Sequence, residues 1–455
     1  MLRGSPSLVK GARLRIWSLR GSWVQIPPPA YRIVKLILLI HNYTAMRHRI
    51  IVTPPGQKAL KVIEAMRSRC YDSTFTYPLV VKDGEGCYIE DVDGNIYLDF
   101  TSCIGSCPLG YKHKDVTEVL REYSSIGAHK IAGQDFYCEE HALLAERVLA
   151  VAPREFKAFF INSGAEAVEN AIKLAYKAMG ALPGVSCINA FHGRTLGALT
   201  FTFSKPVQKN NFPELPVKRI RFCTREDDED IDAIEYLLKE NKVAFIITEI
   251  VQGEGGYNIA SKRFIRKLRE CSERYNVPLI IDEVQSGIAR TGRWWAFEHY
   301  DIKPDIICAA KALQVGATLY HKRFDPNQQG VLSSTWGGGH RIDMAVGAKI
   351  IEVIARDRLM DNAYAMGRLL LHGLMDIMKE SKDSIIDVRG LGLMIGVEFA
   401  SKELRDRFLI QAFKNGLLLL PAGIKAVRVI PPLIINKEEV YEGLEIIHST
   451  INKLV

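Results

Sequence analysis

The chain has 455 residues, of which 47% are hydrophobic and 25% charged; this composition is ordinary for a globular protein, and the length exceeds that of one small core. Nine cysteines without a CxxC pair argue against a disulfide framework or a zinc site, so we expect no metal and reduced thiols. The formal charge of +8 comes from residues 1–45, which carry seven basic and no acidic residues. The rest of the chain is near +1, so nucleic-acid binding is not expected.

The basic segment 1–45 has three interpretations. A secretory signal is disfavoured because the apolar run IVKLILLI is short, contains Lys35 and begins far from the amino terminus. A mitochondrial transit peptide agrees with the arginines, the serines and the lack of acids. Alternatively, WVQIPPP at 23–29 can be translated from the T-arm of a tRNA gene, and translation would then begin near Met46. We expect a cytoplasmic protein, or one of the mitochondrial matrix if 1–45 are a transit peptide, and no membrane span.

After residue 45 the pattern of apolar residues changes twice. From residue 77, alternating runs separated by DGEG and DVDGN predict a small antiparallel meander. After Pro153, apolar runs alternate with helical spacing. The runs lie at 156–164, 185–193, 242–250, 277–284 and 304–311, and the clearest helices at 165–180 and 261–276. This alternation predicts βαβ units and a mainly parallel sheet covered on both faces.

The last third of the chain begins with a helical pattern over 341–380. Strand patterns follow at 384–400 and 417–433, and a helix is predicted from 437 to the end. The acidic stretch 225–237 is interpreted as a loop and a helix start. We expect an α/β fold in which 108–350 form a large domain, and 46–107 with 351–455 form a smaller α+β domain.

In a parallel α/β sheet, ligands bind beyond the carboxyl ends of the strands. The predicted strands are followed there by a small-residue turn, an aromatic ring, an imidazole, two acids and a lysine: Ser163-Gly164, Phe191-His192, Glu249, Asp282 and Lys311. So many functional groups at one edge of the sheet indicate a site.

Each of these residues also has a purely structural interpretation. Ser163, Gly164 and Ala165 begin a helix, where backbone N–H groups favour an anion, but Ser163 with Glu166 also fits a capping box. Asp282 ends an apolar strand and needs a cation or a donor, although it could cap a helix. Lys311 could extend to solvent, yet in a water-poor site its pKa would fall and its amine would react with an aldehyde. The presence of all three favours the functional interpretation.

From about residue 77 to its end, the chain resembles the class III (ω-) aminotransferases of PLP fold type I. The motifs that carry the resemblance are FINSGAEAVENAIKLA, AFHGRTLGALTFT, TEIVQGEGG, IIDEVQSGIARTGRWWAFEHYDIKPDIICAAK and SSTWGG. The resemblance implies pyridoxal 5′-phosphate (PLP) as the cofactor, an amino donor and a 2-oxo acid acceptor as small-molecule substrates, and a homodimer.

The resemblance also assigns roles to residues around the cofactor. It implies that Lys311 binds PLP covalently and moves the substrate proton, and that Asp282 pairs with the ring nitrogen. Val284 would lie under the ring, Gln285 at its hydroxyl and Phe191 on its other face. The remaining predicted cofactor-binding residues are Ser163, Gly164, Ala165 and His192, together with Thr335, which would reach the phosphate of the neighbouring subunit.

For the substrates, Arg194 matches the arginine that binds the carboxylate remote from the reacting amine. Arg428 matches a switchable arginine for an α-carboxylate, and Glu254 the acid that pairs with it when an ω-amine is bound. Such a pair lets one pocket accept a donor without an α-carboxylate and then 2-oxoglutarate, without leaving a buried charge unpaired. Ile104 and Glu249 complete the predicted substrate-binding set.

The identity of the donor stays open at this level. Ile104 and HGRT favour 4-aminobutyrate, whereas LPAG…VR, STWGG and KxxQV resemble lysine 6-aminotransferases. Ornithine is disfavoured because ornithine enzymes often carry tyrosine in place of Ile104. A racemase or aminomutase on the same scaffold is a further alternative. A nicotinamide oxidoreductase, suggested by RGLGLMIG at 389–396, lacks the helix that such a motif requires.

Overall fold

The computed structural model describes residues 14–17, 23–26, 47–72, 76–133, 135–332, 337–381 and 383–454. The chain divides into two units, Met1–Met46 and a larger body, Arg47–Val455. In the first unit, β1 (Leu14–Trp17) pairs antiparallel with β2 (Trp23–Ile26). The interpretations of residues 1–45 and the domain boundaries at 107/108 and 350/351 stay predictions.

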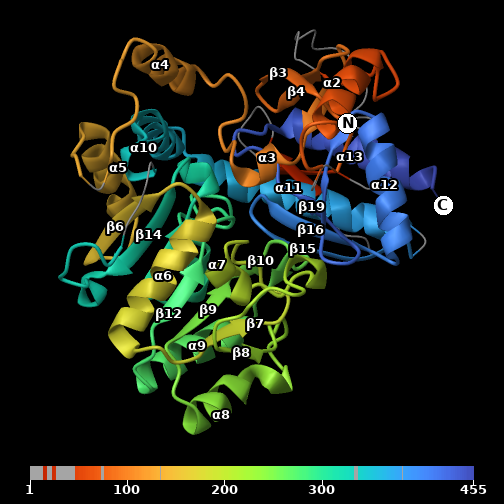
Figure 1. Ribbon diagram of the computed structural model, residues 1–455. Helices are drawn as coiled ribbons and strands as arrows, with labels where there is room; N and C mark the ends of the chain where they lie inside the picture. Colours follow the sequence, from red (N-terminus) through yellow and green to blue (C-terminus); the bar gives the residue numbers. More distant parts are fainter. Residues whose placement is uncertain are drawn as a thin grey trace. The chain divides into compact units, whose positions relative to one another are not determined.

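A seven-stranded sheet forms the centre of the body (Figure 1). Six strands are mutually parallel, and β14 runs antiparallel between β6 and β13. The order is β6 (Phe156–Ile161), β14 (Gly316–His321), β13 (Ile306–Ala309), β12 (Leu279–Asp282), β9 (Phe245–Glu249), β7 (Gly184–Cys187) and β8 (Val217–Ile220). The predicted mainly parallel sheet is confirmed. The antiparallel β14, which follows the 3-10 turn Lys311–Leu313, was not anticipated.

Both faces of this sheet are covered because its strands are apolar on both sides. Ile280 and Ile306 pack in the cluster that includes α6 (Gly164–Met179), while Ile281 and Ile307 face the other and larger core. The helices of this half of the body are α4 (Lys114–Tyr123), α5 (Glu139–Ala150), α7 (Leu196–Thr200), α8 (Ala233–Glu240) and α9 (Lys262–Arg274).

Of the two smaller four-stranded sheets, one combines segments from both ends of the body and the other lies within the carboxy-terminal part. One has the order β17 (Leu417–Leu418), β5 (Ile96–Asp99), β4 (Tyr88–Asp91) and β3 (Val81–Glu85), so the predicted meander pairs with a strand more than 300 residues later. The other is antiparallel: β15 (Ile385–Leu391), β16 (Met394–Phe399), β19 (Ala426–Val429) and β18 (Leu420–Ala422). Because β15 and β16 form a hairpin that turns at Gly392, RGLGLMIG opens no helix.

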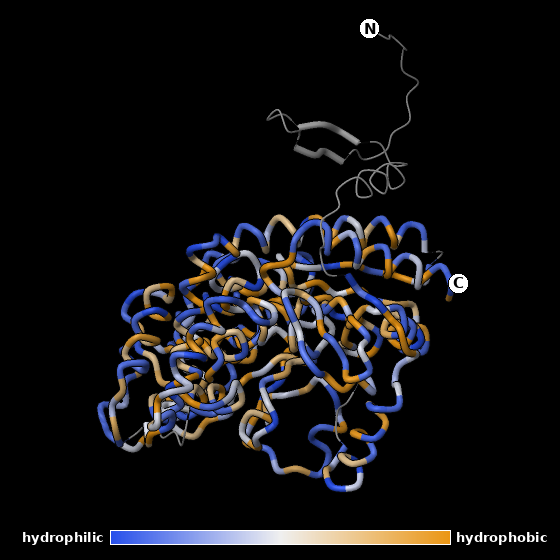
Figure 2. Tube along the Cα trace, turned by 90° about the horizontal axis from the view of Figure 1, so that it is seen from above, coloured by the Kyte–Doolittle hydropathy of each residue, from blue (hydrophilic) through white to orange (hydrophobic). Residues whose placement is uncertain are grey.

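The helical pattern over 341–380 is two helices instead of one. The structure ends α10 (Arg341–Arg356) and starts α11 (Leu359–Glu380) around Arg358, whose φ of 54° is left-handed. No glycine or proline marks this break, so the apolar periodicity predicted one continuous helix across it. The other helices are α2 (Gln57–Arg67), α3 (Ser102–Gly105), α12 (Lys402–Lys414) and α13 (Lys437–Asn452). Hydrophobic and hydrophilic residues alternate along the outer helices (Figure 2), and no helix among the described residues is long and apolar enough to cross a membrane.

Candidate active site

The carboxyl ends of β13, β12, β9 and β7 lie next to one another in the central sheet, and their polar residues meet there as predicted. Lys311 follows β13 by two residues, Asp282 ends β12 and Glu249 ends β9. Burial lowers the pKa of Lys311 to about 8. The charges of Arg428, Asp282, Glu254 and Glu249 also act on its amine, so residues separated by more than 170 positions form one site.

Asp282 is held by hydrogen bonds from two directions. Its Oδ2 lies 2.8 Å from Nδ1 of His192, and its Oδ1 accepts from the backbone N–H of Val284 at 3.0 Å. Both side chains are buried, and Nε2 of His192 has no partner among the described residues. These contacts orient the carboxylate so that it can face a protonated ring nitrogen, and His192 acts through Asp282.

The start of α6 has the features of a capped helix and also those of an anion-binding site, the two interpretations given for Ser163. The Ser163 Oγ accepts from the backbone N–H of Glu166 at 3.3 Å, which confirms the cap. The first N–H groups of a helix have no acceptor within it, and they favour an anion. Gly164 is constrained by packing: a Cβ there would lie 2.7 Å from Cγ1 of Val284. Gly164 therefore lets the helix start approach the residue predicted to lie under the ring.

Gln285 connects the central sheet to the loop that carries Ile104. Its Nε2 donates to the Ile104 carbonyl at 3.4 Å, and its buried Oε1 has no partner among the described residues. Ile104 is exposed and has a left-handed φ of 60°. Gln314, which sequence reasoning missed, donates to the Ser106 carbonyl at 2.9 Å and so ties this loop to the segment of Lys311.

Both carboxylate oxygens of Glu249 accept hydrogen bonds from backbone N–H groups. Its carboxylate accepts from the N–H of Phe191 at 3.0 Å and of Gly253 at 2.9 Å. Burial raises its pKa to about 7. Through these contacts Glu249 positions the backbone of Phe191 and the turn at Gly253. Its contact with substrate stays a prediction.

Arg428 and Glu254 form the predicted internal pair. Nη2 of Arg428 lies 2.5 Å from Oε1 of Glu254, and its Nε donates to the Pro421 carbonyl at 3.1 Å. Lys205, a residue that sequence reasoning missed, lies 3.3 Å from Oε2 of Glu254. Burial alone would raise the pKa of Glu254, but the positive charges of Arg428 and Lys205 outweigh it and bring the pKa to about 2.

Arg194 lies apart from this pair and is exposed, with its guanidinium carbon 5.8 Å from the centre of the Phe191 ring. That distance allows a weak cation–π contact. A carboxylate at Arg194 would therefore lie beside the ring that is predicted to stack on the cofactor. Thr335, predicted to reach the neighbouring site, lies outside the described residues.

This set of groups fits PLP. An amine with a lowered pKa suits an aldehyde, a fixed buried carboxylate suits a pyridinium, and a helix start suits a phosphate. The unpartnered Oε1 of Gln285 is an acceptor that a bound ring would use, and the missing Cβ at Gly164 lets the helix start approach Val284. Asp282, Lys311, Gln285 and the start of α6 are the groups that would hold it.

Comparisons with known proteins agree with this chemistry. The profile of class-III aminotransferases matches residues 71–451. The chain is 35% identical to an acetylornithine aminotransferase of Archaeoglobus fulgidus, over 81% of this chain and 94% of that protein. It is 31% identical to an alanine/serine racemase of Pyrococcus horikoshii, over 89% and 92%. The lysine aminotransferase from M. tuberculosis in the internal aldimine form superimposes with a TM-score of 0.82 at 27% identity, over 87% of this chain and all of that one.

Proposed function

Because the chain belongs to the class-III aminotransferase family, whose members depend on PLP, we propose that this PLP enzyme moves an amino group from an ω-amino acid to 2-oxoglutarate. The products are the corresponding semialdehyde and glutamate. The pair of Arg428 and Glu254 beside Lys311 carries the proposal.

The pair explains how one pocket serves two substrates. An ω-amine donor has no carboxylate on the reacting carbon, so Arg428 would be a buried unpaired cation without Glu254. 2-Oxoglutarate has a carboxylate there, which displaces Glu254 from Arg428, while Arg194 binds its distal carboxylate. Once Glu254 has been displaced from Arg428, Lys205 still offsets its negative charge.

The other residues bind the cofactor and move the proton. Bound PLP supplies an electron sink for the reacting carbon. The Nζ of Lys311 would take a proton from that carbon and pass it to the cofactor, which needs the neutral amine that burial favours. Asp282, oriented by His192, would keep the ring nitrogen protonated, and the unpartnered Oε1 of Gln285 would accept from the ring hydroxyl. Val284 and Phe191 would enclose the ring, and Gly164 and Ala165 would bind the phosphate.

The donor is the least constrained part of the proposal. The sequence favours 4-aminobutyrate on account of Ile104 and HGRT, but the relatives compared do not support that preference, since they are named for acetylornithine and lysine. All these donors share an ω-amine and a distant carboxylate, which suit the pair and Arg194 alike. The proposal is therefore an ω-amino donor, with 4-aminobutyrate and N-acetylornithine as the first two compounds to test.

A racemase is a second candidate because one relative carries that name. The two functions differ in the visible absorption band of the cofactor bound to Lys311. We would add 4-aminobutyrate, N-acetyl-L-ornithine, L-ornithine, L-lysine and L-alanine separately to the PLP-loaded full chain. An aminotransferase loses the band with its donor and regains it with 2-oxoglutarate. A stable band together with slow racemisation of an amino acid would replace the proposal by the second candidate.

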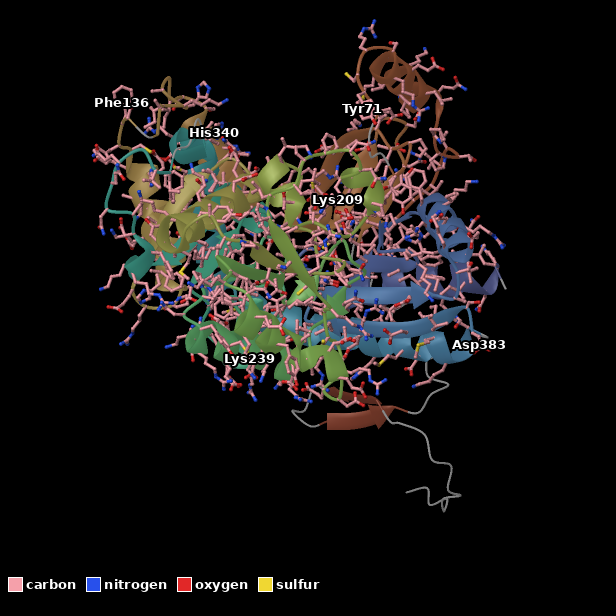
Figure 3. The ribbon with its side chains drawn as sticks, turned by 60° about the horizontal axis from the view of Figure 1, so that its bottom comes forward. Tyr71, Phe136, Lys209, Lys239, His340 and Asp383 are labelled. Atoms are coloured by element: carbon pink, nitrogen blue, oxygen red, sulfur yellow. The ribbon has the colours of Figure 1, made fainter. Side chains whose placement is uncertain are left out.

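We also propose a homodimer. Phe136 and Tyr137 are largely exposed although apolar residues of this size are usually covered, and Figure 3 shows Phe136 at the periphery of the body. Their loop borders the segment that follows Thr335, since Ile131 donates its N–H to the Gly339 carbonyl. A second subunit over this surface would bring Thr335 to the neighbouring site. Size-exclusion chromatography with light scattering tests the dimer; a monomer would refute it.

A further inference from the structure

Three buried polar atoms close to the pair of Arg428 and Glu254 have no hydrogen-bond partner among the described residues. They are Oη of Tyr257, Nη1 of Arg428 and Nη2 of Arg290. Tyr257 is fully buried, and burial raises its pKa, so its hydroxyl is neutral at physiological pH. The positive charges that act on it are those of Arg428 and Arg290. A neutral hydroxyl can accept hydrogen bonds from both guanidinium groups.

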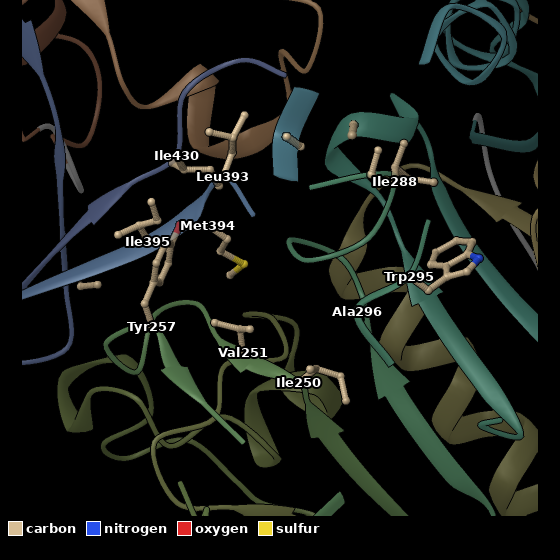
Figure 4. Close-up of a cluster of buried hydrophobic side chains, with 14 of the residues drawn as sticks. Ile250, Val251, Tyr257, Ile288, Trp295, Ala296, Leu393, Met394, Ile395 and Ile430 are labelled. Atoms are coloured by element: carbon tan, nitrogen blue, oxygen red, sulfur yellow. The ribbon is translucent and has the colours of Figure 1, made fainter. Parts of the chain in front are cut away.

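The backbone places Tyr257 and Arg428 at the same surface. Gly396 of β16 lies opposite Arg428 of β19 in their antiparallel ladder, and residues in that relation project to one face of a sheet. A Cβ at Gly396 would lie 2.7 Å from Cβ of Tyr257, so Tyr257 occupies the space that this glycine leaves beside Arg428. Figure 4 shows its ring along the Met394 and Ile395 segment of β16.

Tyr257 and Glu254 belong to one turn. The short hairpin of β10 (Val251–Gln252) and β11 (Asn258–Ile259) carries both residues in its connection. Tyr257 has a left-handed φ of 57° there, a conformation that is uncommon for a bulky residue and therefore indicates a constraint. One turn thus presents a carboxylate and a phenol to the same arginine.

Arg428 has three donor groups, and two of them have acceptors. Nε donates to the Pro421 carbonyl and Nη2 to Glu254, while Nη1 has no acceptor among the described residues, and Tyr257 acts on the same guanidinium. Arg290, the second cation that acts on Tyr257, is anchored because its Nη1 donates to the carbonyls of Leu393 and Pro431. Burying Nη1 and Oη unpaired is unfavourable, and a bond between them removes both penalties.

We propose that Tyr257 is a positioning residue for Arg428: its hydroxyl oxygen accepts a hydrogen bond from Nη1 and holds the guanidinium in its position against Glu254. The consequence rests on the proposed function, in which the α-carboxylate of 2-oxoglutarate displaces Glu254. A group that stabilises only the Glu254-paired position favours ω-amine donors and opposes the acceptor, because a ligand shifts an equilibrium only through its differential affinity for the two states.

Tyr257→Phe removes the hydroxyl and keeps the ring. We expect the PLP-loaded variant to bind glutarate, an unreactive dicarboxylate, about two- to tenfold more tightly, the effect of one hydrogen bond. The KM for 2-oxoglutarate should fall by a similar factor, while the KM for the ω-amine donor stays or rises and kcat changes little. Spectral titration gives the glutarate Kd and steady-state kinetics the two KM values. Unchanged glutarate affinity, or equal changes in both KM values, overturns the proposal.

Two further variants separate positioning from general damage. Tyr300→Phe also removes a buried hydroxyl, one that donates to the Ala260 carbonyl at 2.8 Å, and it should leave the glutarate Kd unchanged. In a Glu254→Gln background, where the paired position is weakened, the effect of Tyr257→Phe should shrink; an undiminished effect contradicts the mechanism. If the wild type neither binds glutarate nor responds to 2-oxoglutarate, the proposed function fails. If it does both and Tyr257→Phe changes nothing, only this inference fails.

Discussion

Nδ1 of His192 lies 2.8 Å from Oδ2 of Asp282, and both side chains are buried, although β9 separates the strands β7 and β12 that precede them in the sheet. The pair connects the HGRT segment to the strand that ends in the ring-facing carboxylate. Loss of the imidazole would leave one carboxylate oxygen without its donor, and hydrogen bonds to charged groups are stronger than neutral ones.

The first prediction concerns this pair. His192→Ala should weaken PLP binding by about tenfold or more, because Asp282 loses the contact that orients it. His192→Asn should recover most of the affinity, since its side-chain amide can donate from a position close to that of Nδ1. Equilibrium titration of the apo-protein with PLP measures both variants. Equal losses in the two variants would show that the volume of the imidazole matters and its hydrogen bond does not.

The second prediction concerns pH and Lys311. Burial lowers the pKa of its amine to about 8, and only the neutral form attacks an aldehyde. The rate of PLP attachment to the apo-protein should therefore rise with pH through about 8 and then level off, instead of rising on towards the ordinary lysine pKa of about 10.4. Stopped-flow absorbance gives this profile. Lys311→Ala should show no borohydride-trapped adduct; an adduct in that variant would place the attachment on another lysine.

The third prediction concerns Gly164. An added Cβ would lie 2.7 Å from Cγ1 of Val284, so Gly164→Ala should displace the residue that supports the ring and weaken PLP binding by about tenfold. Gly127→Ala is the matched control because nothing lies within 4 Å of its added Cβ. Its PLP affinity should equal that of the wild type. Normal affinity in Gly164→Ala would mean that Val284 does not support the ring.

The fourth prediction separates the two arginines. Arg428→Ala should raise the KM for 2-oxoglutarate by about tenfold or more, because a paired carboxylate loses its cation, and should affect the donor half-reaction less. Arg194→Ala should abolish activity with every carboxylate-bearing donor, since that carboxylate is shared by both half-reactions. Single-turnover measurements with donor and with acceptor distinguish the two cases. If both variants lose the donor and the acceptor half-reactions to the same extent, the separate carboxylate-binding roles of Arg194 and Arg428 are wrong.

Much of the fold could be predicted because its strands are locally encoded. The runs that became β9, β12 and β13 are buried throughout and β6 is mostly apolar, and each is followed by residues that were expected at the site. The failures have local causes as well. The break at Arg358 has no glycine or proline to announce it, and no element was predicted between Lys311 and the helical pattern at 341, where β14 lies.

The sequence by itself determined the types of reactive group and their order after the strands, and the motif around Lys311 determined the family. Only the tertiary structure decided which groups touch. Arg428 and Glu254 are 174 positions apart, and the contacts of Lys205, Gln314 and Tyr257 have no local signature because each lone residue could equally face solvent or core. The pKa of Lys311 also depends on burial, which a linear pattern does not contain, since burial arises only when β13, β14 and the smaller sheets pack around that amine.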